Sequence, residues 1–229
     1  METVQLPGGI VYDAYAAGGS AGGAALFVHG FGSRRDGEKA RHLGSVLPGA
    51  GISFVAPDLR GHGESAGRLE ELTIEGAIGD VVRVAVRAGF FRASRRALIG
   101  SSFGALVAAW ASVDHPRLCH RLVLLAPAFG FVERHRATMR VKSEWVDARL
   151  SEDLVEESAR RRDEDLARRL AVPTLILHGE RDEAVPVDAS RAFVRARPDV
   201  RLLVVPGGDH RLTAWKELIA REVLGFLAA

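Results

Sequence analysis

The stretch RRALIGSSFGALVAAWASVD, residues 95–114, decides the fold of this chain. Its first part, RRALIG, is a short apolar run typical of a buried strand, and its second part, from Phe103 to Asp114, fits a helix. Between them lies the pattern Gly-x-Ser-x-Gly, with Ser102 at its centre. A sharp strand-to-helix turn exposes such a serine at the sheet edge, and the glycines allow helix and strand to approach closely. The stretch therefore predicts an α/β fold with Ser102 as a candidate nucleophile.

The same alternation of strand and helix continues along the chain. Longer periodic segments, at 37–51, 73–88, 103–114, 188–196 and 212–227, fit helices. Short apolar runs between them are expected to be strands buried on both faces: AALFVHG (24–30), ISFVAPD (52–58), RRALIGS (95–101), RLVLLAP (121–127), PTLILHG (173–179) and RLLVVPG (201–207). This pattern predicts a mostly parallel central sheet with helices on both faces. The segment before residue 18 is expected to add an antiparallel edge strand.

One region interrupts the alternation. Between Pro127 and Pro173 there is no strand-like run but a charged stretch with helical character. It is far longer than the two to six residues of an ordinary connection, so it needs its own structure. We interpret 128–172 as a small helical lid inserted after a core strand of a single domain, 1–229. The alternative is a solvated helical excursion that takes no part in chemistry.

Composition excludes several classes of protein. The net charge is only +2 and the charges are interspersed, so no nucleic-acid tail or membrane anchor is expected. The stretch METVQLPGG has no charged segment followed by an apolar one, so we expect no secretory signal, and no apolar run reaches about 18 residues. We therefore expect a cytoplasmic protein. Cys119 is the single cysteine, so an internal disulfide is excluded. No metal cluster or phosphate loop occurs, and we expect no cofactor. Whether the chain forms a homo-oligomer stays open.

Two serines satisfy the Gly-x-Ser-x-Gly pattern, and their surroundings separate them. Ser20 follows Ala-Ala-Gly-Gly and precedes a strand, so it belongs to a turn. Ser102 has a strand before it and a helix after it, as a nucleophile requires. The helix N-terminus also places the backbone N–H of Phe103 where it can stabilise an oxyanion.

The serine needs a base, and the base needs a carboxylate. Of the eight histidines, His210 follows the last strand and precedes the last helix, where a loop would return to the sheet edge. Asp182 follows a strand at the same edge, in HGERDEAVP. Its competitors are less well placed: Glu180 and Glu183 flank it, Asp188 lies further on, and Asp209 adjoins His210. We predict Asp182 as the residue that orients His210.

Five segments together resemble the α/β-hydrolase superfamily, and they follow that family's order along nearly the whole chain: FVHGFGS (27–33), APDLRGHGES (56–65), GSSFG (100–104), HGERDEAVP (178–186) and GGDHRL (207–212). The order Ser102, Asp182, His210 is also the family's order. The resemblance implies that Phe31 supplies a second oxyanion N–H beside that of Phe103. It also implies that Asp58–Ser65 braces the loops around the site rather than taking part in catalysis.

Compact size and the HGFGS and GDHR segments look most similar to bacterial carboxylesterases, including cinnamoyl-esterase-like enzymes, and to acyl-protein thioesterases. This resemblance implies hydrolysis of carboxylic esters or thioesters with small to medium acyl groups, through an acyl-enzyme on Ser102. An aminopeptidase or amidase could use the same three residues, with an acidic residue holding the free amine; Glu144, Asp147, Glu152 and Asp153 are the candidates. A non-catalytic binding protein on this scaffold is the third possibility.

Aromatic and sulfur-containing side chains of the lid are candidates for an acyl pocket. We expect Phe129, Phe131, Met139 and Trp145 to contribute to its wall, together with the rings of Phe31 and Phe103. The alternative is that several of these residues only pack the lid onto the core.

Overall fold

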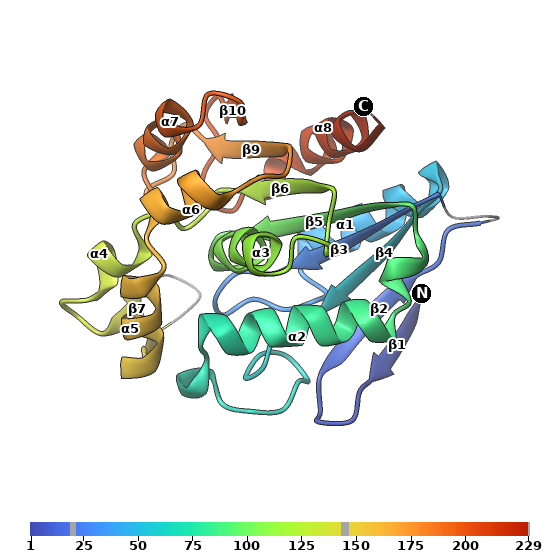
Figure 1. Cartoon of the computed structure of the whole chain (residues 1–229), viewed down its shortest axis with the longest axis horizontal. Coiled ribbons are helices and arrows are strands. Elements are labelled where there is room, and N and C mark those ends of the chain that lie inside the picture. Colours follow the sequence, from blue (N-terminus) through green and yellow to red (C-terminus); the bar gives the residue numbers. More distant parts are fainter. Residues whose placement is uncertain (19–21, 143–146, 229) are drawn as a thin grey trace.

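A computed structural model describes residues 1–18, 22–142 and 147–228 of the chain. Its centre is an eight-stranded sheet in the order β1-β2-β4-β3-β5-β6-β9-β10 (Figure 1). The strands are β1 (Glu2–Gln5), β2 (Val11–Tyr15), β3 (Gly23–Val28), β4 (Ile52–Pro57), β5 (Arg95–Ser101), β6 (Arg121–Leu125), β9 (Thr174–Gly179) and β10 (Arg201–Val205). From β4 to β10 all neighbours are parallel. The predicted fold class, a mostly parallel sheet of the α/β-hydrolase type, is confirmed.

The amino-terminal strands form an antiparallel hairpin at the sheet edge. β1 pairs with β2, and β2 pairs antiparallel with β4, with Tyr12 opposite Pro57. The sequence predicted one antiparallel edge strand here, and the structure contains two.

Helices cover both faces of the sheet (Figure 1). One face packs against α2 (Ile74–Arg87) and α3 (Phe103–Asp114), and the other against α1 (Glu38–Val46) and α8 (Lys216–Ala228). α7 (Val187–Ala196) packs against β9 and β10. The described part of the chain also contains four short 3₁₀ helices: η1 (Leu47–Ala50), η2 (Leu69–Glu71), η3 (Phe90–Arg92) and η4 (Thr213–Trp215). No described helix is both long and apolar enough to cross a membrane.

Burial of the central strands on both faces explains their continuous apolar sequences. Every residue of β3 and β9 is buried, and alternate side chains enter two separate hydrophobic cores. In β5, for example, Leu98 faces the core under α2 and α3, whereas Ala97 and Ile99 face the core under α1 and α8. A sheet covered on both sides selects apolar residues at consecutive positions rather than at every second one.

The insertion between β6 and β9 contains helices and a small hairpin. It comprises α4 (Phe131–His135), the antiparallel pair β7 (Arg140–Lys142) and β8 (Asp147–Arg149), α5 (Glu152–Arg160) and α6 (Asp163–Arg169). The sequence predicted a small helical lid here, and the structure has a two-stranded hairpin beside the helices. Each strand has three residues with one apolar side chain between two charged ones, which is too short to give a strand signal.

The insertion lies at the carboxyl end of the sheet. Figure 1 shows the arrowheads of β5, β6 and β9 pointing toward the side where α4 is found. α5 packs against α2, and α6 packs against α3 and α7. The insertion is thereby attached to the helices that flank the strand ends.

Candidate active site

Ser102 occupies a strained turn between β5 and α3. Its φ and ψ are 55° and −120°, a backbone conformation that residues with a side chain rarely adopt. Glycines on either side make the turn possible, because a Cβ on Gly100 would lie 2.4 Å from Ala105 Cα, and one on Gly104 only 2.2 Å from the His29 carbonyl oxygen. The backbone N–H of Ser102 donates to the Leu125 carbonyl at 2.9 Å. The turn thus holds the Ser102 side chain at the carboxyl edge of the sheet.

Two loops at the same edge bring Asp182 and His210 together. The backbone N–H of Arg181 donates to the Gly208 carbonyl at 2.8 Å, and a Cβ on Gly179 would lie 2.4 Å from that same oxygen. Glycine is therefore needed at position 179 for the loops to approach. On the other side of His210, the Lys39 ammonium donates to the Arg211 carbonyl at 2.6 Å.

The three predicted residues form one hydrogen-bonded chain. Ser102 Oγ lies 2.9 Å from His210 Nε2, and His210 Nδ1 lies 2.7 Å from Asp182 Oδ2. A carboxylate only accepts, so the imidazole proton is on Nδ1 and Nε2 is free to accept the Ser102 hydroxyl proton. The second oxygen of Asp182 accepts the backbone N–H groups of Ala184 and Val185 at 3.0 and 2.7 Å. The geometry is that of a serine nucleophile with its base and orienting acid.

The environment of Asp182 keeps it ionised. Burial by itself would raise the pKa of this carboxyl, but hydrogen bonds from His178 and His210 and the backbone N–H of Val185 together hold the pKa well below its usual range. The carboxylate side chain has no exposed area. It can therefore stabilise a positive charge on His210 at neutral pH.

The competing acidic residues have other partners. Asp209 accepts the backbone N–H of Leu212 at 2.7 Å, and Glu180 accepts that of Gly207 at 3.0 Å. Both thus stabilise the loop that carries His210 rather than contacting its ring. Ser20, the alternative serine, lies outside the described residues.

The turn that carries Phe31 lies directly beside Ser102. A Cβ on Gly30 would lie 3.2 Å from Ser102 Cβ. The backbone N–H of Gly32 donates to His62 Nε2 at 3.0 Å, and His62 Nδ1 in turn donates to the Arg60 carbonyl at 3.0 Å. These bonds hold the turn in place, and the N–H of Phe31 takes no part in them.

Phe103 is the first residue of α3, so its N–H has no acceptor within that helix. The rings of Phe31 and Phe103 meet edge to face, with centroids 6.0 Å apart. Both residues predicted for an oxyanion hole therefore lie next to Ser102.

A cavity of about 510 Å³ opens onto Ser102 and His210. Phe31, Phe103 and Phe131 contribute aromatic rings to its wall, and Val141 of the hairpin adds an apolar side chain. The insertion thus borders the candidate site.

Two of the predicted pocket residues do not line this cavity. Phe129 is 1% exposed and stacks on Phe193, with ring centroids 4.4 Å apart, so it joins the insertion to α7. Met139 packs against the hydrophobic core. Their contacts are those of the alternative interpretation, in which these side chains pack the insertion onto the core. Trp145 lies outside the described residues.

Sequence reasoning missed a role for His178, which is fully buried and has its Nε2 3.1 Å from Asp182 Oδ2. Its position four residues before Asp182, at the end of a strand, was the available signal. Lys39 was also missed. Burial in the cavity wall lowers the pKa of its ammonium to about 8, and nothing in a helical segment such as 37–51 indicated this placement.

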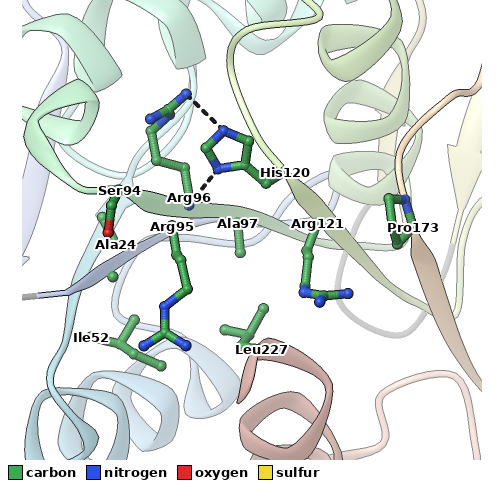
Figure 2. Close-up of a pocket in the computed structure, with 11 residues that line it drawn as sticks. Ala24, Ile52, Ser94, Arg95, Arg96, Ala97, His120, Arg121, Pro173 and Leu227 are labelled. Carbon is green, nitrogen blue, oxygen red and sulfur yellow. Dashed lines mark hydrogen bonds between the residues drawn. The ribbon is translucent and has the colours of Figure 1, made fainter. Parts of the chain in front are cut away.

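A second hollow, of about 250 Å³, lies at the opposite edge of the sheet, where β5 and β6 begin. Figure 2 shows Arg95 and Arg121 pointing toward the side of Leu227, whereas Arg96 lies beside His120 on the other side of the strand. Neither Ser102 nor His210 lines this hollow. This hollow is therefore separate from the candidate site at the carboxyl edge.

Comparisons with known proteins agree with this architecture. The sequence model of the family described as "Serine aminopeptidase, S33" matches residues 19–163, which is more than half of the chain. The dihydrolipoyllysine-residue acetyltransferase component of the acetoin cleaving system of Cupriavidus necator is 36% identical over 118 residues. That match covers 51% of this chain and 29% of the relative, so the chain spans less than a third of that protein's length.

Several solved structures share the fold over their whole length. Est1E from Butyrivibrio proteoclasticus, with ferulic acid bound, has a TM-score of 0.86 and 24% identity, covering 100% of this chain and 98% of that one. Mouse alpha/beta hydrolase domain-containing protein 10 has a TM-score of 0.82 and 21% identity, covering 99% and 98%. The monoacylglycerol lipase of Paleococcus ferrophilus has a TM-score of 0.76 and 20% identity, covering 99% of this chain and 98% of that one.

The strained serine turn, the strand order and the match to the family model all lead to one classification. The chain is an α/β hydrolase and belongs to the hydrolase family described as "Serine aminopeptidase, S33".

Proposed function

We propose that this protein is a serine hydrolase that cleaves carboxylic ester or thioester bonds through an acyl-enzyme on Ser102. The observation that carries the proposal is the continuous chain of hydrogen bonds from Ser102 Oγ through His210 to Asp182, at 2.9 and 2.7 Å. A serine at its ordinary pKa is a weak nucleophile, and a neutral histidine held in this tautomer is the group that activates it.

In the first step Ser102 Oγ attacks the substrate carbonyl carbon while its proton moves to His210 Nε2. The carbonyl oxygen becomes an oxyanion, which the N–H groups of Phe31 and Phe103 stabilise by hydrogen bonding. The tetrahedral intermediate then collapses, the bond to the leaving alcohol or thiol breaks, and His210 returns the proton to that leaving group. Asp182 stays ionised throughout and stabilises the imidazolium.

Water enters in the second step. His210 removes a proton from the water as its oxygen attacks the acyl carbon, and the ester bond to Ser102 breaks with return of the proton to Ser102 Oγ. The products are a carboxylic acid and the free enzyme. A cavity of about 510 Å³, partly walled by four phenylalanines, fits a small to medium acyl group.

The charges around the cavity favour an ester over a substrate with a free amine. Five basic side chains line it and two acidic ones: Arg34, Lys39, Arg134, Lys142 and Arg211 against Glu38 and Glu183. A positive surround disfavours an ammonium group.

The family's description makes an aminopeptidase the second candidate. Among the insertion's acidic residues considered for holding an amine, Asp147 pairs with Arg140 on the neighbouring strand. Glu152 and Asp153 begin α5, and neither is among the described residues lining the cavity. Glu144 lies outside the described residues. Of the two carboxylates that line the cavity, Glu38 pairs with Arg211 at 3.5 Å, so Glu183 is the one that this second candidate would use.

The deciding experiment measures hydrolysis of p-nitrophenyl esters from acetate to palmitate by the wild type and by Ser102→Ala, beside an aminoacyl p-nitroanilide and a thioester. We expect ester turnover with an optimum at short to medium chains, and a loss of about 10³-fold or more in kcat for Ser102→Ala. Turnover of the anilide alone would establish the aminopeptidase. A folded wild type without activity on any substrate would favour a binding protein on a hydrolase scaffold.

A further inference from the structure

His178 lies in β9, immediately behind the candidate catalytic acid. Its side chain is fully buried, and both ring nitrogens have partners. Nδ1 is 2.7 Å from the hydroxyl of Ser190 on α7. Nε2 is 2.9 Å from the Val185 carbonyl oxygen and 3.1 Å from Asp182 Oδ2.

Two of these partners determine the hydrogen on Nε2. The Val185 carbonyl and the Asp182 carboxylate can only accept, so Nε2 of His178 carries a hydrogen that points between them. The Ser190 hydroxyl can then donate to Nδ1, which completes the hydrogen bonding of a neutral ring. Ser190 is also fully buried, so water does not compete for this bond.

Oδ2 of Asp182 consequently receives two imidazole N–H groups, one from His210 at 2.7 Å and one from His178 at 3.1 Å. Oδ1 receives two backbone N–H groups. Four donors thus surround a carboxylate whose side chain is fully buried, which prevents rotation of its plane. From its position in the sequence, His178 is expected to be a packing residue, but its contacts show that it hydrogen-bonds the candidate catalytic acid, Asp182.

We propose that His178, held by Ser190, is a positioning residue: it fixes Asp182 and sets the pH at which His210 can act as a base. This inference rests on the proposed function for its effect on rate. The physical reason is that His178 and His210 share the negative charge of Asp182 Oδ2. A donor on Oδ2 withdraws part of the negative charge that would otherwise stabilise the His210 imidazolium. Without His178, Asp182 would stabilise that imidazolium more strongly, and His210 would keep its proton to higher pH.

Other charged groups near Asp182 do not replace this effect. The Lys39 ammonium interacts electrostatically with Asp182, and with Arg211, Asp209 and Glu38 around it. Lys39 donates its hydrogen bond to the Arg211 carbonyl, so it does not contact the carboxylate oxygen that faces His210. His178 is the side chain that shares Oδ2 with His210 in the described part of the chain.

The test compares His178→Met, which keeps a similar volume but has no N–H donor, with His178→Gln, whose amide N–H can replace it. Both are made in the Ser102→Ala protein, and the His210 ring is titrated by NMR through its carbon-bound protons. We expect His178→Met to raise the titration midpoint by about half a pH unit or more, with His178→Gln closer to the parent protein. Ser190→Ala should shift it less and in the same direction, because Nε2–H is a weaker donor without the Ser190 bond.

Ser112→Ala is the matched control, since Ser112 is another buried serine, with its hydroxyl bonded to the Ala109 carbonyl in α3. It should leave the midpoint unchanged. In the active enzyme, the acidic limb of the kcat/KM profile should move to higher pH in His178→Met, lowering kcat/KM about threefold or more below that limb.

Folded His178→Met protein with an unchanged midpoint would overturn the inference and leave His178 as a packing residue. If His178→Met does not fold, Ser190→Ala decides: an unshifted midpoint there overturns the inference as well. The titration needs no turnover, so failure of the proposed function is seen separately, as an inactive wild type whose His210 midpoint still responds to His178.

Discussion

Loss of the Arg35 side chain should destabilise this fold strongly, because it pairs with two buried carboxylates. Its guanidinium donates to Oδ2 of Asp58, to Asp13 at 3.2 Å and to Glu64 at 3.0 Å. Its backbone N–H donates to the other Asp58 oxygen at 2.7 Å. Asp58 has no exposed side-chain area and Asp13 only 5%. Arg35 therefore joins β2 to the loop after β4, immediately beyond the turn that carries Phe31.

Arg35→Met would remove the cation and leave two carboxylates buried near each other without a countercharge. Breaking a buried ion pair on one side costs about 3–5 kcal/mol. For a domain of this size each kcal/mol lowers Tm by roughly 2–4 °C, so we expect a fall of about 6–20 °C. Burial by itself would lower the pKa of the Arg35 guanidinium, but the hydrogen bonds that it donates to Asp58 and Asp13 raise this pKa, which is consistent with strong coupling.

The assay is thermal unfolding followed by circular dichroism, with Arg34→Met as the control. Arg34 is the preceding residue and also pairs with an aspartate, Asp36, at 2.9 Å, but its side chain is 61% exposed. An exposed pair contributes about 0–1 kcal/mol, so this variant should lose no more than about 4 °C. Equal losses in the two variants would refute the reasoning, because burial would then not determine the cost.

Three further predictions concern other parts of the fold. Phe129→Ala should lower the free energy of unfolding by about 3–5 kcal/mol through loss of its stack on Phe193, whereas Phe131→Ala should chiefly change ester chain-length preference; urea unfolding and the ester series distinguish them. Gly104→Ala should yield little folded protein, because the added Cβ would lie 2.2 Å from the His29 carbonyl oxygen. The measurement is the yield of soluble protein, with Gly225→Ala as the control, because no atom lies within 4 Å of a Cβ added there. Burial, together with the neighbouring His62, lowers the pKa of His29 to about 4, so its neutral form contributes stability that is lost as pH falls from about 6.5 to about 4. That contribution is up to about 3 kcal/mol, and the urea midpoint of His29→Gln should depend less steeply on pH over this range than that of the wild type.

Much of the fold follows from local sequence. Six apolar runs became the six parallel strands, since a strand buried on both faces needs consecutive apolar residues and little else produces that pattern. The hairpin at Arg140–Arg149 gave no such signal, because its strands have three residues each and expose their charged side chains. Phe129 and Phe131 are two residues apart and both belong to the same hydrophobic core, yet only Phe131 also lines the cavity. No local property of the sequence distinguishes them.

The candidate site, too, has features that follow from the local sequence and others that depend on the tertiary structure. The sequence by itself determined the type and order of the groups, Ser102 after a strand, then Asp182, then His210, because each must lie where a strand ends and these positions are local. Only the tertiary structure decided that they meet at 2.9 and 2.7 Å, since this depends on the close approach of the loops at Gly179 and Gly208. It also decided that His178 shares Asp182 with His210. Contacts between residues far apart in sequence depend on how the elements pack, and this packing produces no periodic pattern in the sequence.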